Sequence, residues 1–162
     1  MKYVYVLTSA PEDFYYEQAL MSVYSLRKKM PDAKITVLTD DKTKNSFSDE
    51  NKRTAILKYA SEIISVDFSP EIPNADRSRL IKTSIPEYVD GSFLYIDCDT
   101  IICDDLSEIE NENAVTGGVL DGHVLLNEHI HKKYFLARDK KLGFKGTKAA
   151  GYNINGGLIL AK

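Results

Sequence analysis

Apolar and polar positions along this chain form short β-type runs that alternate with stretches of helical spacing. Runs rich in β-branched and aromatic residues, bounded by turn formers, predict strands at 2–8, 35–39, 63–68, 92–96, 114–120 and 155–161. Apolar residues three or four positions apart predict helices at 16–30, 49–59, 76–85 and 125–142, the third ending before Pro86. Strands that alternate with helices predict an α/β fold, with a mostly parallel central sheet and helices on both faces.

The composition is that of one soluble globular domain. The chain has 162 residues, 43% of them hydrophobic and 28% charged, which is enough for a single domain with its own core. A net charge of −3 argues against binding to nucleic acid through phosphate contacts. No transmembrane run or signal pattern is present, so we expect the protein in the cytoplasm, free or at the inner face of a membrane. Cys98 and Cys103 are too few for a disulfide scaffold and are interpreted as buried free thiols.

The most informative segment is 93–102, where an apolar strand is followed by two aspartates one residue apart. Asp97 and Asp99 share a parity, so in an extended chain they point to the same side. A buried carboxylate without a positive partner is strongly unfavourable, and hard oxygen ligands suit Mg²⁺ or Mn²⁺. The alternative is a strand end followed by an Asx turn, in which Asp99 caps what comes next.

Other polar residues fall at predicted strand ends, where ligands bind in open α/β sheets. Arg79 precedes the aspartate strand and is a cation for phosphate or a carboxylate, a solvated helix charge, or a partner for Glu87. The three histidines, at 123, 129 and 131, are interpreted as a solvated loop and helix start, because their spacing is poor for a metal site on a helix. The chain lacks a Gly-x-Gly-x-x-Gly or Walker loop, which argues against a dinucleotide or P-loop site.

The order of motifs resembles the family-eight glycosyltransferases, which are retaining sugar-nucleotide transferases of the GT-A fold related to glycogenin. The resemblance rests on Arg79-Leu80, Pro86, the segment 93–102, Asp105-Leu106, Gly117-Gly118-Val119-Leu120-Asp121 and Asn155-Gly156-Gly157-Leu158. It implies a GT-A-like fold. The family also has a late His-x-x-Gly-x-x-Lys segment that supplies a third metal ligand. No such segment occurs by Lys162, so we expect a chain that is truncated at its C-terminus.

The resemblance also implies a role for particular residues in a single nucleotide-sugar-binding domain, 1–162. Asp97 and Asp99 would hold Mn²⁺, or Mg²⁺, against the diphosphate. The nucleotide-sugar contacts would be Thr8, Tyr15, Tyr16, Asp40, Arg79, Asp97 and Asp99. Asp121 and Asn155 would be the catalytic residues, in contact with the donor sugar and the acceptor.

The implied function is metal-dependent, retaining transfer of a hexose from a nucleotide sugar, of the UDP-linked class, to a hydroxyl acceptor. The acceptor would be a glycan, a lipid-linked glycan or a protein, and the chain itself could form a homo-oligomer. Two alternatives stay open. One is a catalytically incomplete module or fragment that binds nucleotide sugar. The other is an enzyme like the sugar nucleotidyltransferases. The sequence disfavours this alternative, because it lacks a Gly-rich N-terminal loop followed by a basic residue.

Overall fold

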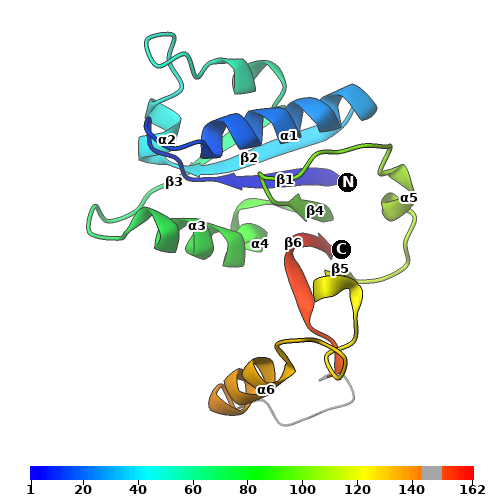
Figure 1. Ribbon diagram of the computed structural model, residues 1–162. Helices are drawn as coiled ribbons and strands as arrows, with labels where there is room; N and C mark the ends of the chain where they lie inside the picture. The colour runs from blue at the N-terminus through cyan, green and yellow to red at the C-terminus, as the bar shows by residue number, and fades with distance from the viewer. Residues whose placement is uncertain (144–150) are drawn as a thin grey trace.

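A computed structural model describes residues 1–143 and 151–162 of the chain (Figure 1). The strands are β1 (Lys2–Leu7), β2 (Lys34–Asp40), β3 (Glu62–Val66), β4 (Phe93–Ile96), β5 (Thr116–Leu120) and β6 (Ile154–Ala161). The helices are α1 (Tyr15–Lys29), α2 (Asp41–Asn45), η1 (Ala55–Lys58), α3 (Asn74–Thr83), α4 (Ile85–Tyr88), α5 (Ser107–Glu110), η2 (Asp121–His123) and α6 (Lys132–Lys141).

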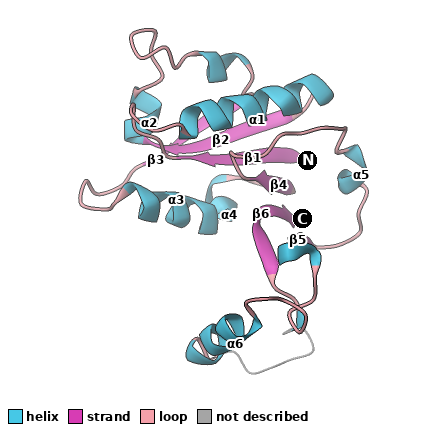
Figure 2. Cartoon of the chain, viewed as in Figure 1, coloured by secondary structure: helices cyan, strands magenta, loops and turns pink. Residues whose placement is uncertain are grey.

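All six strands belong to one sheet, in the order β3-β2-β1-β4-β6-β5 (Figure 2). β1 pairs in parallel with β2 and β4, and β2 pairs in parallel with β3. Among the strands of the described residues, β6 alone runs the other way, antiparallel to β4 on one side and to β5 on the other. The predicted mostly parallel α/β sheet is therefore confirmed, and the predicted strands all have counterparts in it.

Alternation along β1 divides the core into two layers. Tyr3, Tyr5 and Leu7 pack with α1 and η1 on one face of the sheet. Val4 and Val6 pack with α3 and α4 on the other face. Figure 1 shows α1 on one side of the sheet and α3 with α4 on the opposite side. Since parallel strands all end at the same edge, the loops after β1 and β4 emerge together between these two helical layers.

The predicted helix at 49–59 is wrong. Only η1 forms there, while 41–45, where no helix was expected, forms α2. Polar side chains between them favour turns: the Asn51 amide donates to the Ser46 carbonyl at 3.2 Å and to Ser48 Oγ at 3.1 Å. Arg53 is buried and donates to Ser46 Oγ at 3.0 Å, which fixes the segment to the domain without a helix.

Two other helices differ from their predicted bounds. α3 begins two residues before 76 and ends at Thr83, and Pro86 lies in the first turn of α4 rather than after a helix end. The predicted helix at 125–142 begins only at Lys132, because residues 124–131 form turns and Leu126 donates its amide to the Gly151 carbonyl at 2.9 Å. Within 1–143 and 151–162, no helix has the length and apolar character needed to cross a membrane.

Candidate functional site

A pocket of about 570 Å³ opens at the carboxyl ends of β1 and β4, between α1 and α3. Residues of both helical layers and of both strand ends line it: Thr8, Asp13, Tyr15, Gln18, Asn74, Ser78, Arg79, Lys82, Tyr95, Asp97, Cys98 and Asp99. A larger hollow of about 770 Å³ surrounds Met1 and Lys162 at the amino ends of the strands, and no predicted site residue lines it. Thr8, Tyr15, Arg79, Asp97 and Asp99, all predicted site residues, are thus brought to one pocket.

Asp97 and Asp99 both line this pocket, but strand parity is not the reason. β4 ends at Ile96, and the two aspartates lie in the turn that follows, closed by Thr100 Oγ1 donating to the Asp97 carbonyl at 2.6 Å. Asp97 is half-buried, and its amide donates to the Gly157 carbonyl of β6 at 2.8 Å. Asp99 is exposed and also borders a shallow groove of about 330 Å³ that the apolar side chain of Phe14 helps to line.

The Asp97 carboxylate already has two partners. Lys82 Nζ lies 3.1 Å from Oδ1, and the Tyr95 hydroxyl donates to the same oxygen. Burial of the Tyr95 ring, together with the nearby Asp97 carboxylate, raises the pKa of Tyr95 above its usual range, so the hydroxyl stays protonated and acts as a donor. Oδ2 of Asp97 faces β6, 3.1 Å from the position that a Cβ on Gly157 would take.

Three predicted nucleotide contacts line the same pocket, from the loop after β1, from α1 and from α3. Thr8 Oγ1 donates to the Asn74 carbonyl at 3.4 Å. Tyr15 is largely exposed at the start of α1, and Asp13 accepts from its amide at 3.0 Å. The Arg79 side chain is 80% exposed and meets Asp76 at 3.5 Å, not Glu87, so it is available to a ligand in the pocket.

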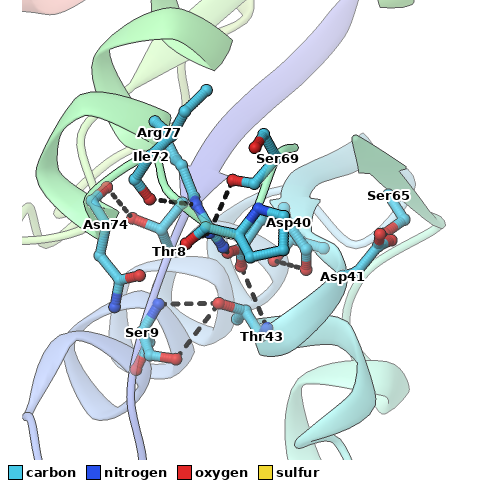
Figure 3. Close-up of polar contacts among 12 residues, drawn as sticks. Thr8, Ser9, Asp40, Asp41, Thr43, Ser65, Ser69, Ile72, Asn74 and Arg77 are labelled. Carbon is cyan, nitrogen blue, oxygen red and sulfur yellow. Dashed lines mark hydrogen bonds and ion pairs between the residues drawn. The ribbon is translucent and has the colours of Figure 1, made fainter. Parts of the chain in front are cut away.

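Asp40 does not reach the pocket, which corrects its predicted place among the nucleotide contacts. It is 2% exposed at the end of β2, and its carboxylate pairs with the buried Arg77 at 2.9 Å. The other carboxylate oxygen accepts from the Thr43 amide at 3.0 Å and caps α2. Figure 3 shows this arrangement, with Arg77 also bound to the Ile72 carbonyl at 2.7 Å. Asp40 is therefore a structural residue.

Tyr16 is likewise in the core and not in the pocket. Its side chain is 2% exposed, its ring packs beside Phe47, and its hydroxyl accepts from the Ile56 amide at 3.3 Å. The guanidinium of Arg53 lies 4.8 Å from the centre of the same ring. Tyr15 and Tyr16 are adjacent on α1 and so point to different sides, and only Tyr15 faces the pocket.

Asp121 and Asn155 lie on the β5–β6 side of Asp97. The Asn155 side chain accepts from the Gly157 amide at 2.7 Å, and the Gly157 carbonyl accepts from the Asp97 amide, so Asn155 and Asp97 flank one segment of β6. Asp121 follows the last residue of β5, and neither Asp121 nor Asn155 is among the residues that line the pocket. The Asp121 carboxylate accepts from the Asn153 amide at 2.8 Å.

Two residues next to the predicted set escaped the sequence analysis. Lys82 contacts Asp97, and its position three residues after Arg79 on one helix could have indicated it. His129, interpreted as solvated, has a side chain only 7% exposed, with Nε2 3.5 Å from Asp121 Oδ2.

The two cysteines differ from each other. Cys103 is exposed rather than buried, while burial raises the pKa of the Cys98 thiol to about 12 and keeps it protonated.

Solved structures of glycosyltransferases share this architecture. The galactosyltransferase LgtC, solved in complex with donor and acceptor sugar analogs, matches with a TM-score of 0.65 and 19% identity over 99% of this chain and 57% of LgtC. The glycosyltransferase GlyE of Streptococcus pneumoniae TIGR4 matches with a TM-score of 0.54 and 16% identity over 99% of this chain and 33% of GlyE. The chain has the glycosyltransferase fold. The fold implied by the motif resemblance is thereby confirmed, although no family model and no curated protein matches the sequence. This chain spans just over half of LgtC and a third of GlyE.

Proposed function

We propose that this domain binds a nucleotide sugar of the UDP-linked class in the pocket at the ends of β1 and β4, as the donor-binding part of a glycosyltransferase. The observation that carries the proposal is that Asp97 and Asp99 line one pocket of this fold together with the cations Arg79 and Lys82. A diphosphate needs positive charge around it, and an exposed tyrosine at the pocket rim offers a face on which a base can stack.

The residues present fit a divalent ion that is shared with the nucleotide. Among residues 1–143 and 151–162, no group of three or more His, Cys, Asp or Glu side chains could hold a metal by itself. Mn²⁺ and Mg²⁺ accept one or two carboxylates when phosphate oxygens and waters complete the shell. Asp97 and Asp99 supply such carboxylates in the pocket, and the ion would stabilise the charge on the leaving diphosphate.

In the proposed reaction the bond between the anomeric carbon and the diphosphate oxygen breaks, and the acceptor hydroxyl oxygen bonds to that carbon. The products are the nucleoside diphosphate, the glycoside and the proton of the hydroxyl. Tyr15 and Thr8 would hold the nucleoside, while Arg79 would hold the diphosphate. Asp121 and Asn155 would contact the donor sugar and the acceptor, which is a glycan, lipid-linked or protein hydroxyl. Retention at the anomeric carbon is what the family resemblance implies.

A binding module without turnover is the second candidate. It is favoured by the set of metal ligands, because among the described residues no third His, Cys, Asp or Glu side chain completes a metal site with Asp97 and Asp99. The third carboxylate that lines the pocket, Asp13, already accepts from the Ser9 hydroxyl and from two backbone amides. Such a module would bind nucleotide and ion together but would neither hydrolyse nor transfer the sugar. Hydrolysis or transfer assays with UDP-sugars separate it from the enzyme, because both candidates predict the same nucleotide binding.

Calorimetric titration of UDP, with Mn²⁺ and then with EDTA, tests the proposed function. We expect saturable binding of UDP that is stronger with Mn²⁺, and weaker binding of CMP, which lacks the diphosphate. A panel of UDP-hexoses, assayed for release of UDP with and without added sugar acceptors, then tests turnover. Absence of UDP binding under both conditions would refute the proposal for this domain.

Replacement of the two neighbouring tyrosines is expected to affect different properties, UDP binding for Tyr15 and stability for Tyr16. Tyr15→Ala removes an exposed ring from the pocket rim and should weaken UDP binding about tenfold, since stacking on a base contributes roughly 1–3 kcal/mol. Its free energy of unfolding should change by less than about 0.5 kcal/mol. Tyr16→Ala should lower that free energy by about 3–5 kcal/mol, because it empties a core position. Urea denaturation and UDP titration of both variants check this, and equal destabilisation by the two would contradict it.

A further inference from the structure

Lys82, one of the two cations of the pocket, is already paired with a carboxylate proposed to hold the ion. Its ammonium lies 3.1 Å from Asp97 Oδ1 and 4.6 Å from the centre of the Tyr95 ring. Its side chain is 28% exposed, so the pair faces the pocket and is not sealed in the core. One of the two carboxylates proposed for the ion is therefore already neutralised by the protein.

The surroundings of Lys82 restrict where its ammonium can go. Tyr95 lies under it, and a Cβ on Gly156 would lie 3.6 Å from Nζ, so the backbone of β6 closes a second side. The remaining direction is the pocket, where Arg79 lies on the same helix. A lysine on a flexible four-carbon stem can exchange one oxygen partner for another a few ångströms away, and phosphate oxygens are strong acceptors for it.

We propose that Lys82 is a protein-borne cation for the donor diphosphate, which pairs with Asp97 in the empty pocket and with phosphate oxygens when nucleotide binds. The inference rests on the proposed function, since it assumes that a nucleoside diphosphate enters this pocket. It has two consequences. Part of the nucleotide affinity is independent of metal, and a divalent ion alone competes with Lys82 for Asp97, so that ion and nucleotide bind together better than either binds by itself.

The first test compares UDP titrations in EDTA for the wild-type protein, Lys82→Met and Lys82→Arg. We expect Lys82→Met to bind UDP about tenfold more weakly, the effect of one charge-assisted hydrogen bond, and Lys82→Arg to stay close to wild type. Lys28→Met is the matched control, because Lys28 also lies over a tyrosine ring, at 5.7 Å from Tyr24, but outside the pocket. Thermal unfolding of each variant shows whether it is folded, and Lys82→Arg separates loss of charge from loss of structure.

The second test measures Mn²⁺ binding without nucleotide, from the electron paramagnetic resonance signal of the free ion. Lys82→Met removes a positive charge beside Asp97, and we expect it to bind Mn²⁺ about threefold more tightly than wild type, a modest gain because the pair is partly solvated. Lys28→Met should not differ from wild type. Equal or weaker Mn²⁺ binding by Lys82→Met would show that Lys82 does not compete for Asp97 and would overturn the inference.

The outcomes separate this inference from the function on which it rests. If wild type binds UDP and Lys82→Met binds it equally well in EDTA, the role of Lys82 is refuted while the proposed function stands. If wild type binds UDP neither in EDTA nor with Mn²⁺, the proposed function fails and the role of Lys82 fails with it. Loss of UDP affinity in Lys82→Met that Lys82→Arg restores, together with tighter Mn²⁺ binding, is the result that supports it.

Discussion

Asp99→Asn is expected to abolish the Mn²⁺-dependent part of UDP binding. The substitution keeps the size of the side chain and removes one of the two pocket carboxylates proposed to hold the ion. With Asp97 paired to Lys82, Asp99 is the more accessible of the two ligands, and an ion held by one carboxylate adds little to the affinity for phosphate. We expect UDP affinity with Mn²⁺ to fall at least about tenfold, to the level that the wild-type protein shows in EDTA.

The control for this prediction is Asp104→Asn, which removes an exposed carboxylate from the same loop but outside the pocket. It should leave the response to Mn²⁺ unchanged. The UDP affinity of Asp99→Asn in EDTA should equal that of wild type, because Asp99 acts only through the ion. An Asp99→Asn protein that still responds to Mn²⁺ as the wild type does would rule out Asp99 as a ligand.

Much of the sheet could be predicted because buried strands leave a clear pattern. Successive residues of β1 point alternately into the two core layers. Because both layers need apolar side chains, the run 2–8 is apolar or aromatic almost throughout. The segment 49–59 gave a false helix because its spacing of apolar residues says nothing of the turns that Asn51 and the buried Arg53 make with Ser46. Such side-chain contacts between loops decide local structure and have no periodic signature.

Site residues could be predicted from their position at a strand end. They could not be predicted where an ion-pair partner from a distant part of the chain decides whether the side chain is buried or faces the pocket. Asp97 and Asp99 were predicted from strand parity, yet they share the pocket because the chain turns after Ile96. Asp40 also ends a strand, but Arg77, on a helix far along the chain, turns its carboxylate into the interior. The sequence shows that both residues are charged, while only the fold shows that they meet.

Loss of one partner of the buried Asp40–Arg77 pair should be among the most destabilising single substitutions of a polar side chain. Both side chains are nearly inaccessible, at 2% and 3% exposed, so removal of one partner leaves a buried charge without its counter-ion. Arg77→Met is expected to lower the free energy of unfolding by about 3–5 kcal/mol. It also removes the donors to the Ser69 and Ile72 carbonyls, which hold the loop before α3.

Asp40→Asn gives a sharper version of the same test. An asparagine can still accept from the Thr43 amide and cap α2, so the variant isolates the loss of charge beside Arg77. We expect a loss of about 3 kcal/mol in urea denaturation, and the double variant Asp40→Asn/Arg77→Met should be less destabilised than the sum of the two single variants. The exposed Asp76–Arg79 pair, on the same helix as Arg77, is the control, and Asp76→Asn should change the free energy of unfolding by less than about 1 kcal/mol.

The Asp40→Asn variant also tests whether Asp40 contacts the nucleotide. Because Asp40 lies outside the pocket, the UDP affinity of folded Asp40→Asn should stay within about twofold of wild type. A large loss of UDP affinity in an Asp40→Asn protein of normal stability would return Asp40 to the nucleotide contacts.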